Sequence, residues 1–102
     1  MLKLVSVSDS TRKGKKYQAL FIDNNNKNKL VHFGAKEYED FTTHKDKDRQ
    51  KRYIARHKVY LKDDVTKPAY LSMFILWNKP NLQASINDYK KRLKNNNWDL
   101  PK

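Results

Sequence analysis

The stretch that decides the fold is KYQALFIDNNNKNKLVHFG, residues 16–34. Residues 16–23 predict the clearest strand, with Gln18, Leu20 and Ile22 on the face opposite to that of the intervening residues. The polar run 24–28 predicts a tight turn, because Asn tolerates left-handed backbone conformations. A second strand is expected over residues 29–33, ended by Gly34. The first strand directs three side chains to one face: Tyr17, Ala19 and Phe21.

The segments on either side extend this sheet and then turn helical. Residues 2–7 predict a third strand, so the β-rich part spans residues 1–34 and forms an antiparallel meander. The helical part spans residues 45–94, with helices expected over 46–58, 69–77 and 82–94. Asp46 or Thr43 would cap the first of these helices and Asn81 the last, before a tail over 95–102 held by Trp98 and Leu100. The expected class is α+β: a small antiparallel sheet of two to three strands followed by two to three helices packed on one face.

Composition allows one small domain over residues 1–102 with a thin core. The chain has 102 residues, 37% of them apolar, and a mean hydropathy of −1.05. The absence of cysteine excludes a disulfide scaffold and thiolate zinc sites. The longest apolar run, Met73–Trp77, is far shorter than the roughly 20 residues of a membrane helix, and the N-terminus lacks a signal-peptide pattern. No membrane association is expected.

The net charge of +12 predicts an anionic partner. The 18 lysines against 5 arginines favour contact with a nucleic-acid backbone over reading of bases, because Arg is the better bidentate reader. A/T-rich coding is a competing cause of this ratio, since the chain also has ten Asn. The partner expected from charge is nucleic acid, DNA in preference to RNA, or an acidic protein.

The charge is densest in residues 45–58, where seven cations face two aspartates, a net +5. On a helix, Lys45, Arg49, Arg52 and Arg56 share one face at a spacing of about 5–6 Å, near that of phosphates along a strand. Tyr53 and Ile54 lie on the side expected to meet the sheet. The alternative is a solvated face with an Asp48–Arg52 pair. The predicted nucleic-acid contacts are Lys45, Lys47, Arg49, Lys51, Arg52 and Arg56, with Lys15, Lys16, Lys90, Lys91 and Arg92 as outer contacts.

Catalytic and metal-binding patterns are weak. His32, His44 and His57 have no metal-ligand spacing, and two glycines do not make a phosphate-binding loop. The acidic run 37–40, beside Lys36 and Lys45, carries only an unspecific hint of a metal-dependent nuclease. We therefore expect no enzyme, no catalytic residue, no metal and no cofactor. Most aromatic residues are assigned to the core (Tyr17, Phe21, Phe33, Phe74, Trp77), and three are expected to be partly exposed (Tyr38, Phe41, Tyr53).

Two motifs resemble a known family. The stretch LVHFGAKEYEDFTTHKD, residues 30–46, is similar to the pattern KVHFGAxGYxDYTxHKD, with Glu37 where that pattern has Gly. The stretch LWNKPNL, residues 76–82, resembles a second signature of the same family. This family comprises small basic proteins of unknown function in nucleocytoplasmic large DNA viruses of amoebae and algae. The resemblance implies a viral setting and no particular activity.

Charge and resemblance together predict a sequence-independent nucleic-acid-binding viral protein, associated with the genome or the virion. Its expected location is the virion or the viral factory in the host cytoplasm. The alternative is a non-enzymatic virion component that docks on an acidic viral protein, and a metal-dependent nuclease comes third. Whether the basic segments form one continuous patch depends on the fold.

Overall fold

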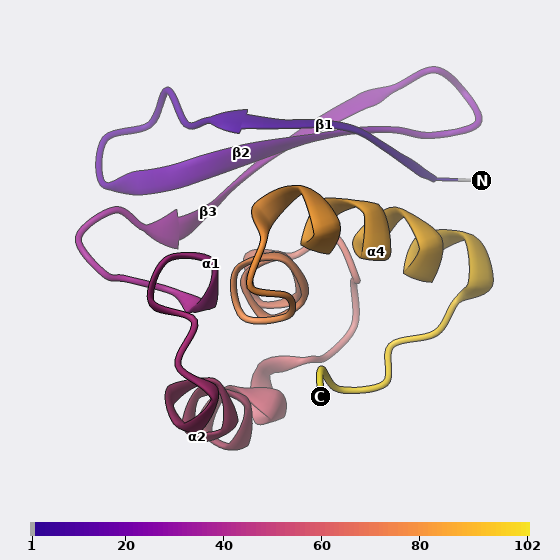
Figure 1. The fold of residues 1–102 in the computed structure, drawn as a ribbon. Helices are drawn as coiled ribbons and strands as arrows, with labels where there is room; N and C mark the ends of the chain where they lie inside the picture. The colour runs from indigo at the N-terminus through magenta and orange to yellow at the C-terminus, as the bar shows by residue number, and fades with distance from the viewer. Residues whose placement is uncertain (1) are drawn as a thin grey trace.

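A computed structural model describes residues 2–102 and contains one three-stranded sheet. The strands β1 (Lys3–Asp9), β2 (Lys15–Ile22) and β3 (Asn28–Ala35) pair antiparallel in the order β1-β2-β3 (Figure 1). The predicted meander and the α+β class are confirmed, and each strand lies within two residues of its expected ends. Alternation and turn chemistry therefore identify this half of the fold.

The inner face of the sheet carries the predicted core residues. Ala19 and Phe21 of β2 and Phe33 of β3 are completely buried. The register pairs Tyr17 with Phe33, and their ring centroids are 6.0 Å apart. No element within residues 2–102 covers the outer face, because the helices of this range lie on the other side of the sheet (Figure 1).

The chain continues as six helical segments: α1 (Phe41–His44), α2 (Lys47–His57), the 3₁₀ turn η1 (Lys58–Tyr60), α3 (Pro68–Leu71), the π-helical turn η2 (Ser72–Leu76) and α4 (Leu82–Asn95). The three expected helices correspond to α2, to α3 with η2, and to α4. The single turn α1 is additional to them. It forms because the Asp40 carboxylate accepts from Thr42 N–H at 2.9 Å while the Thr43 hydroxyl accepts from Asp40 N–H at 3.1 Å, a capping box.

The core lies between the sheet and the segment α3–η2 together with α4. Met73, Phe74 and Ile75 of η2 are completely buried, as is Tyr89 of α4. The tail is held by Trp98, whose ring lies edge-on to Tyr70, Phe74 and Tyr89 at 5.2–5.5 Å. Leu100, expected to share this task, is 37% exposed.

Helix α2 lies beyond η2, on the side away from the sheet (Figure 1). Its buried residue is Gln50, whose side-chain amide donates to the carbonyl oxygens of Trp77 at 3.0 Å and Asn78 at 2.8 Å. The inner side of α2 thus docks on the end of η2, where the sequence suggested contact with the sheet. Within residues 2–102, no helix is both long enough and apolar enough to cross a bilayer.

Candidate nucleic-acid interface

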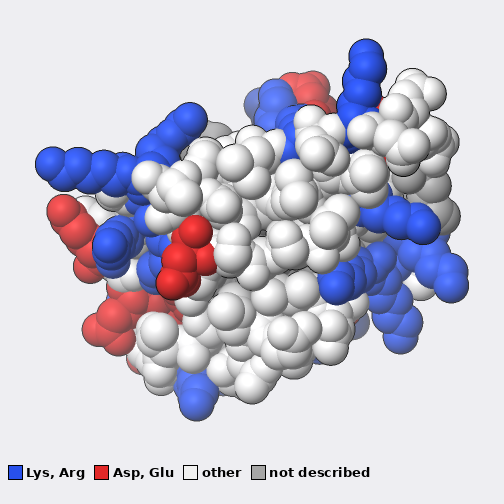
Figure 2. Space-filling view, turned by 90° about the horizontal axis from the view of Figure 1, so that it is seen from above, with Lys and Arg blue, Asp and Glu red and all other residues white. Residues whose placement is uncertain are grey.

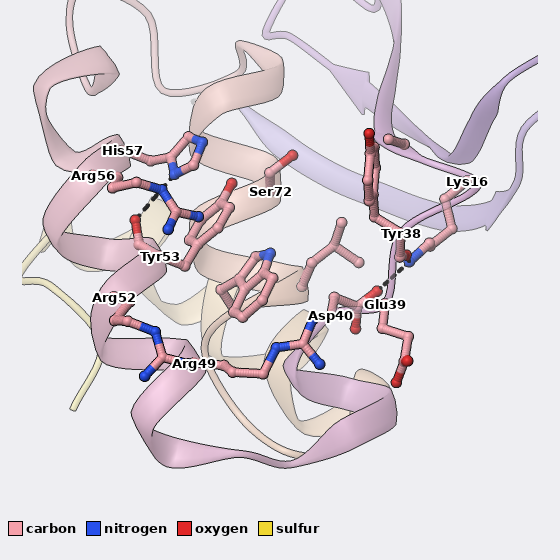
Figure 3. Close-up of a pocket in the computed structure, with 14 residues that line it drawn as sticks. Lys16, Tyr38, Glu39, Asp40, Arg49, Arg52, Tyr53, Arg56, His57 and Ser72 are labelled. Atoms are coloured by element: carbon pink, nitrogen blue, oxygen red, sulfur yellow. Dashed lines mark hydrogen bonds and ion pairs between the residues drawn. The ribbon is translucent and has the colours of Figure 1, made fainter.

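A pocket of about 640 Å³ lies between α2 and the loop that follows β3 (Figure 3). One wall is formed by three arginines of α2: Arg49, Arg52 and Arg56. Tyr53 and Trp77 contribute aromatic rings, and Tyr38 and Glu39 belong to the opposite wall. The pocket therefore brings the densest charge of the sequence to one side of a hollow.

The arginines line the pocket because two contacts fix α2. The Asp46 carboxylate caps the helix by accepting from the N–H groups of Asp48 at 3.0 Å and Arg49 at 3.3 Å. The N–H donors of Arg49 and Asp48 hold the pKa of Asp46 below its usual value, so the cap stays charged at neutral pH. The two bonds of buried Gln50 then set the rotation of the helix. Arg49, Arg52 and Arg56 share a face at helical spacing, which is the face that borders the pocket.

The aromatic rings form a closed stack. Tyr53 stacks on Trp77 at 4.3 Å and 5°, and on His57 at 4.0 Å and 14°. His44 lies 5.2 Å from Trp77. Because both faces of the Tyr53 ring are covered, only its edge and hydroxyl are open to the pocket. Burial raises the pKa of Tyr53 to about 12, so this hydroxyl is a proton donor at neutral pH.

The opposite wall is held by an ion pair. The Lys16 ammonium donates to the Asp40 carboxylate at 2.5 Å and to the Tyr38 carbonyl at 2.7 Å. The Asp40 side chain is 2% exposed and that of Lys16 is 17% exposed. The Lys16 ammonium thereby holds the backbone of Tyr38, a residue that is 72% exposed and lies at the edge of the pocket. The expectation of a partly exposed ring is confirmed for Tyr38 and Tyr53. It is wrong for Phe41, which is buried because the Asp40 cap turns it inward.

Within residues 2–102, none of the three arginines forms an ion pair with a carboxylate. Among the residues that the structure describes, the ion pairs are Lys16–Asp40, Lys29–Asp64, Lys67–Asp63 and Arg92–Asp88. The Asp48–Arg52 pair considered from the sequence is not formed in this set. Glu39 lines the same pocket and opposes part of the charge, while Asp40 is occupied by Lys16. Three guanidinium groups against one unoccupied carboxylate leave the pocket with a positive surplus.

The other predicted cations of this region lie outside the pocket. Lys45 ends α1 in a left-handed conformation and is exposed, as is Lys51. The Lys47 ammonium lies 5.6 Å from the centre of the Phe41 ring. Lys15 begins β2 and is exposed. Contacts of these four lysines with phosphate stay predictions, as does a direct contact by Lys16, whose ammonium is already engaged.

The predicted cations of α4 line other hollows. Lys90 borders one with Leu2, Leu4 and Leu93. Lys91 and Arg92 border another with Asp88 and Asp99. Arg92 donates to the Asp88 carboxylate at 2.7 Å and to the Asp99 carbonyl at 2.6 Å, and it lies 4.6 Å from the centre of the Phe74 ring. The fold therefore gathers Lys16 with the arginines of α2, and it gives Arg92 a role in holding the tail.

The outer face of the sheet does not carry a continuous basic surface. Figure 2 shows this face with Lys and Arg around its margins, acidic residues at the left and upper edges, and an uncharged centre. Leu20 and His32 point outward, because both strand neighbours of each are buried. The register pairs Leu20 with Ser6 and Leu30 and pairs His32 with Gln18, so these three residues share the outer face. A basic surface does not continue across this face.

No metal site is formed by the described part of the chain. In residues 2–102, no group of three or more His, Asp or Glu side chains is arranged to hold a metal ion.

These features define a small basic α+β protein with an arginine-lined pocket. A family model described as a family of unknown function (DUF5754) matches residues 5–57, just over half of the chain, so the chain belongs to this family. The matched segment runs from β1 to the end of α2 and includes all three pocket arginines. No curated protein and no solved structure matches the chain significantly.

Proposed function

We propose that this protein binds nucleic acid without sequence preference, by contacts between phosphates and the arginines of α2. One observation carries the proposal: Arg49, Arg52 and Arg56 border a single pocket, and none of them has a carboxylate partner within residues 2–102. A guanidinium group that is not paired with a carboxylate can donate its hydrogen bonds to phosphate oxygens. The net charge of +12 adds long-range attraction to a polyanion.

The mechanism is neutralisation of phosphates with release of condensed counterions. The Asp46 cap and the Gln50 contacts hold α2 in place. Binding therefore loses less conformational entropy than it would if the arginines lay on a mobile segment. The similarity of residues 30–46 and 76–82 to proteins of large DNA viruses supports a setting at the viral genome or virion, in the viral factory of the host cytoplasm. That setting favours DNA over RNA as the partner.

The test compares two variants that lose the same charge. R49Q/R52Q/R56Q removes three charges from the pocket, and K90Q/K91Q/K94Q removes three from α4. Fluorescence anisotropy with mixed-sequence duplex at about 50 mM salt should show roughly 100-fold weaker binding for the first, from about 1 kcal/mol lost per contact. The α4 variant should lose less than about 10-fold, and circular dichroism should show both folded.

Three outcomes would count against the proposal. Wild-type protein that ignores both DNA and RNA at this salt concentration would end it. Equal losses in the two variants would show that total charge, and not the pocket, governs binding. A partner protein that co-purifies after complete nuclease digestion, with no affinity for nucleic acid, would favour docking on an acidic protein instead.

A further inference from the structure

We infer that the pocket holds the phosphorylated end of a nucleic-acid strand, with the terminal phosphate at the α2 arginines and the adjoining base against Tyr38. The inference rests on the proposed function and names the part of the nucleic acid that the pocket takes.

The shape of the site favours a strand end. An uninterrupted duplex presents its phosphates along a smooth convex surface, which suits contact with an exposed helix. The arginines here border a hollow of about 640 Å³, within the range of pockets that enclose small molecules. A group that projects from its chain can enter such a hollow, and the terminal nucleotide of a strand is one.

The donors of the pocket match a terminal phosphate better than an internal one. A phosphomonoester carries about −1.5 to −2 charges and three strong acceptor oxygens, whereas an internal phosphodiester carries a single charge. The three guanidinium groups approach from α2, and the hydroxyls of Tyr53 and Ser72 lie near one another beside the same cavity (Figure 3). The site thus offers more charge and more donors than a single diester uses.

Tyr38 supplies the contact that identifies a nucleotide. This residue is 72% exposed and lies at the edge of the pocket, opposite the α2 wall (Figure 3). The Tyr53 ring is covered on both faces by Trp77 and His57, whereas the Tyr38 ring is accessible for stacking. The Lys16 ammonium bonded to the Tyr38 carbonyl at 2.7 Å fixes the position of this residue. Stacking of one base on such a ring contributes about 1–3 kcal/mol.

The experiment measures the binding of single strands that differ only at their ends. Mixed-sequence strands of about 12 nucleotides carry a 5′-phosphate, a 3′-phosphate or only hydroxyl ends, and anisotropy is read near 150 mM salt. We expect one phosphorylated strand to bind at least about 10-fold more tightly than the hydroxyl-ended strand. The R49Q/R56Q variant should lose this preference, and the K90Q/K91Q/K94Q variant should keep it.

Tyrosine variants test the base contact. Tyr38→Ala should weaken binding of the preferred strand by about 5-fold or more, and Tyr38→Phe should bind like the wild type, because stacking needs the ring and not the hydroxyl. Tyr60→Ala is the matched control, since Tyr60 is 62% exposed and does not line the pocket.

The outcomes separate this inference from the proposed function. Equal binding of phosphorylated and hydroxyl-ended strands would overturn the inference and leave general phosphate binding intact. Absence of binding to any strand or duplex would overturn both. A phosphoserine peptide that competes as well as the phosphorylated strand would overturn the nucleotide assignment, because it would show that the base adds nothing.

Discussion

At the scale of single residues, Gly34 joins the sheet to the pocket. It lies inside β3 with φ +80°, a conformation that side chains with a Cβ rarely adopt. A Cβ at this position would be 2.9 Å from Leu76 Cδ1 and 3.1 Å from Lys16 Cβ. The sequence identified Gly34 as a strand end. The structure shows a close approach between β3 and η2 beside the pocket wall.

Gly34→Ala should therefore destabilise the protein by about 2–4 kcal/mol, the sum of a left-handed backbone penalty and the displacement of Leu76. Gly14→Ala is the matched control. Its φ is +82°, and no atom lies within 4 Å of an added Cβ, so only the backbone penalty of about 1–2 kcal/mol applies. Urea denaturation measures both, and equal losses would show that the contact with Leu76 is easily relieved.

The residues that sequence assigned correctly have local signals. Ala19, Phe21 and Phe33 follow the alternation of strands, and Asn81 caps α4 as expected by accepting from Ala84 N–H at 3.0 Å. The apolar pattern around Trp77 predicts a core position, yet this residue is half-buried and borders the pocket. Its position depends on stacking with Tyr53, a residue 24 positions earlier, and no local pattern reports such a contact.

At the scale of elements, the ends of α2 and α4 are predictable and the geometry of η2 is not. The π-helical turn ends in a bond from Trp77 N–H to Ser72 C=O at 3.1 Å. Asn78 follows it and donates from its side chain to Phe74 C=O at 3.1 Å and to the Asp88 carboxylate at 2.6 Å. These bonds come from packing between segments. The pocket likewise combines β2, the loop after β3, α2 and η2, so its composition could not be read from one motif.

The connection between η1 and α3 is tied to the sheet in a way that should respond to pH. The Lys29 ammonium of β3 donates to the Asp64 carboxylate at 2.9 Å and to the Thr66 hydroxyl at 2.6 Å. Bonds from the Thr66 hydroxyl, then from Lys29, lower the pKa of Asp64 to about 2. An unfolded-state pKa of 3.8 means that this stabilisation is present above about pH 4 and is lost as the pH falls towards 2.

Asp64→Asn should thus lower the free energy of unfolding by about 1 kcal/mol near pH 6. This figure allows for solvent screening, because the Asp64 side chain is 43% exposed. The difference from wild type should shrink as the pH falls from about 4 towards 2, because protonation of Asp64 removes the carboxylate that Asn lacks at every pH. Denaturant unfolding of both proteins between about pH 6 and pH 2 measures this difference in the free energy of unfolding. Asp63→Asn, at a side chain that is 78% exposed, should show little pH dependence. A difference for Asp64→Asn that is constant with pH would contradict the assigned charge effect.

At the scale of the whole molecule, the +12 charge is widely distributed but its pairing is uneven. Lys16, Lys29, Lys67 and Arg92 are held by carboxylates, while the α2 arginines are without such partners in residues 2–102. The uncharged centre of the outer sheet face interrupts the basic surface (Figure 2). Dispersed cations raise the rate of encounter with a polyanion, whereas cations that touch phosphates set the salt dependence of the affinity.

The salt dependence of binding therefore distinguishes cations that touch phosphates from cations that only attract the polyanion. The slope of log K against log salt concentration changes by about 0.9 for each phosphate contact on duplex DNA. R49Q/R52Q/R56Q should therefore make the slope between about 50 and 200 mM salt less steep by as much as about 2.7, and K90Q/K91Q/K94Q by less than about 1. Weaker binding by the α2 variant with an unchanged slope would mean that the arginines support binding without touching phosphates. Equal changes in both variants would mean that the polyanion contacts α4 as closely as α2, and the interface would then extend beyond the pocket.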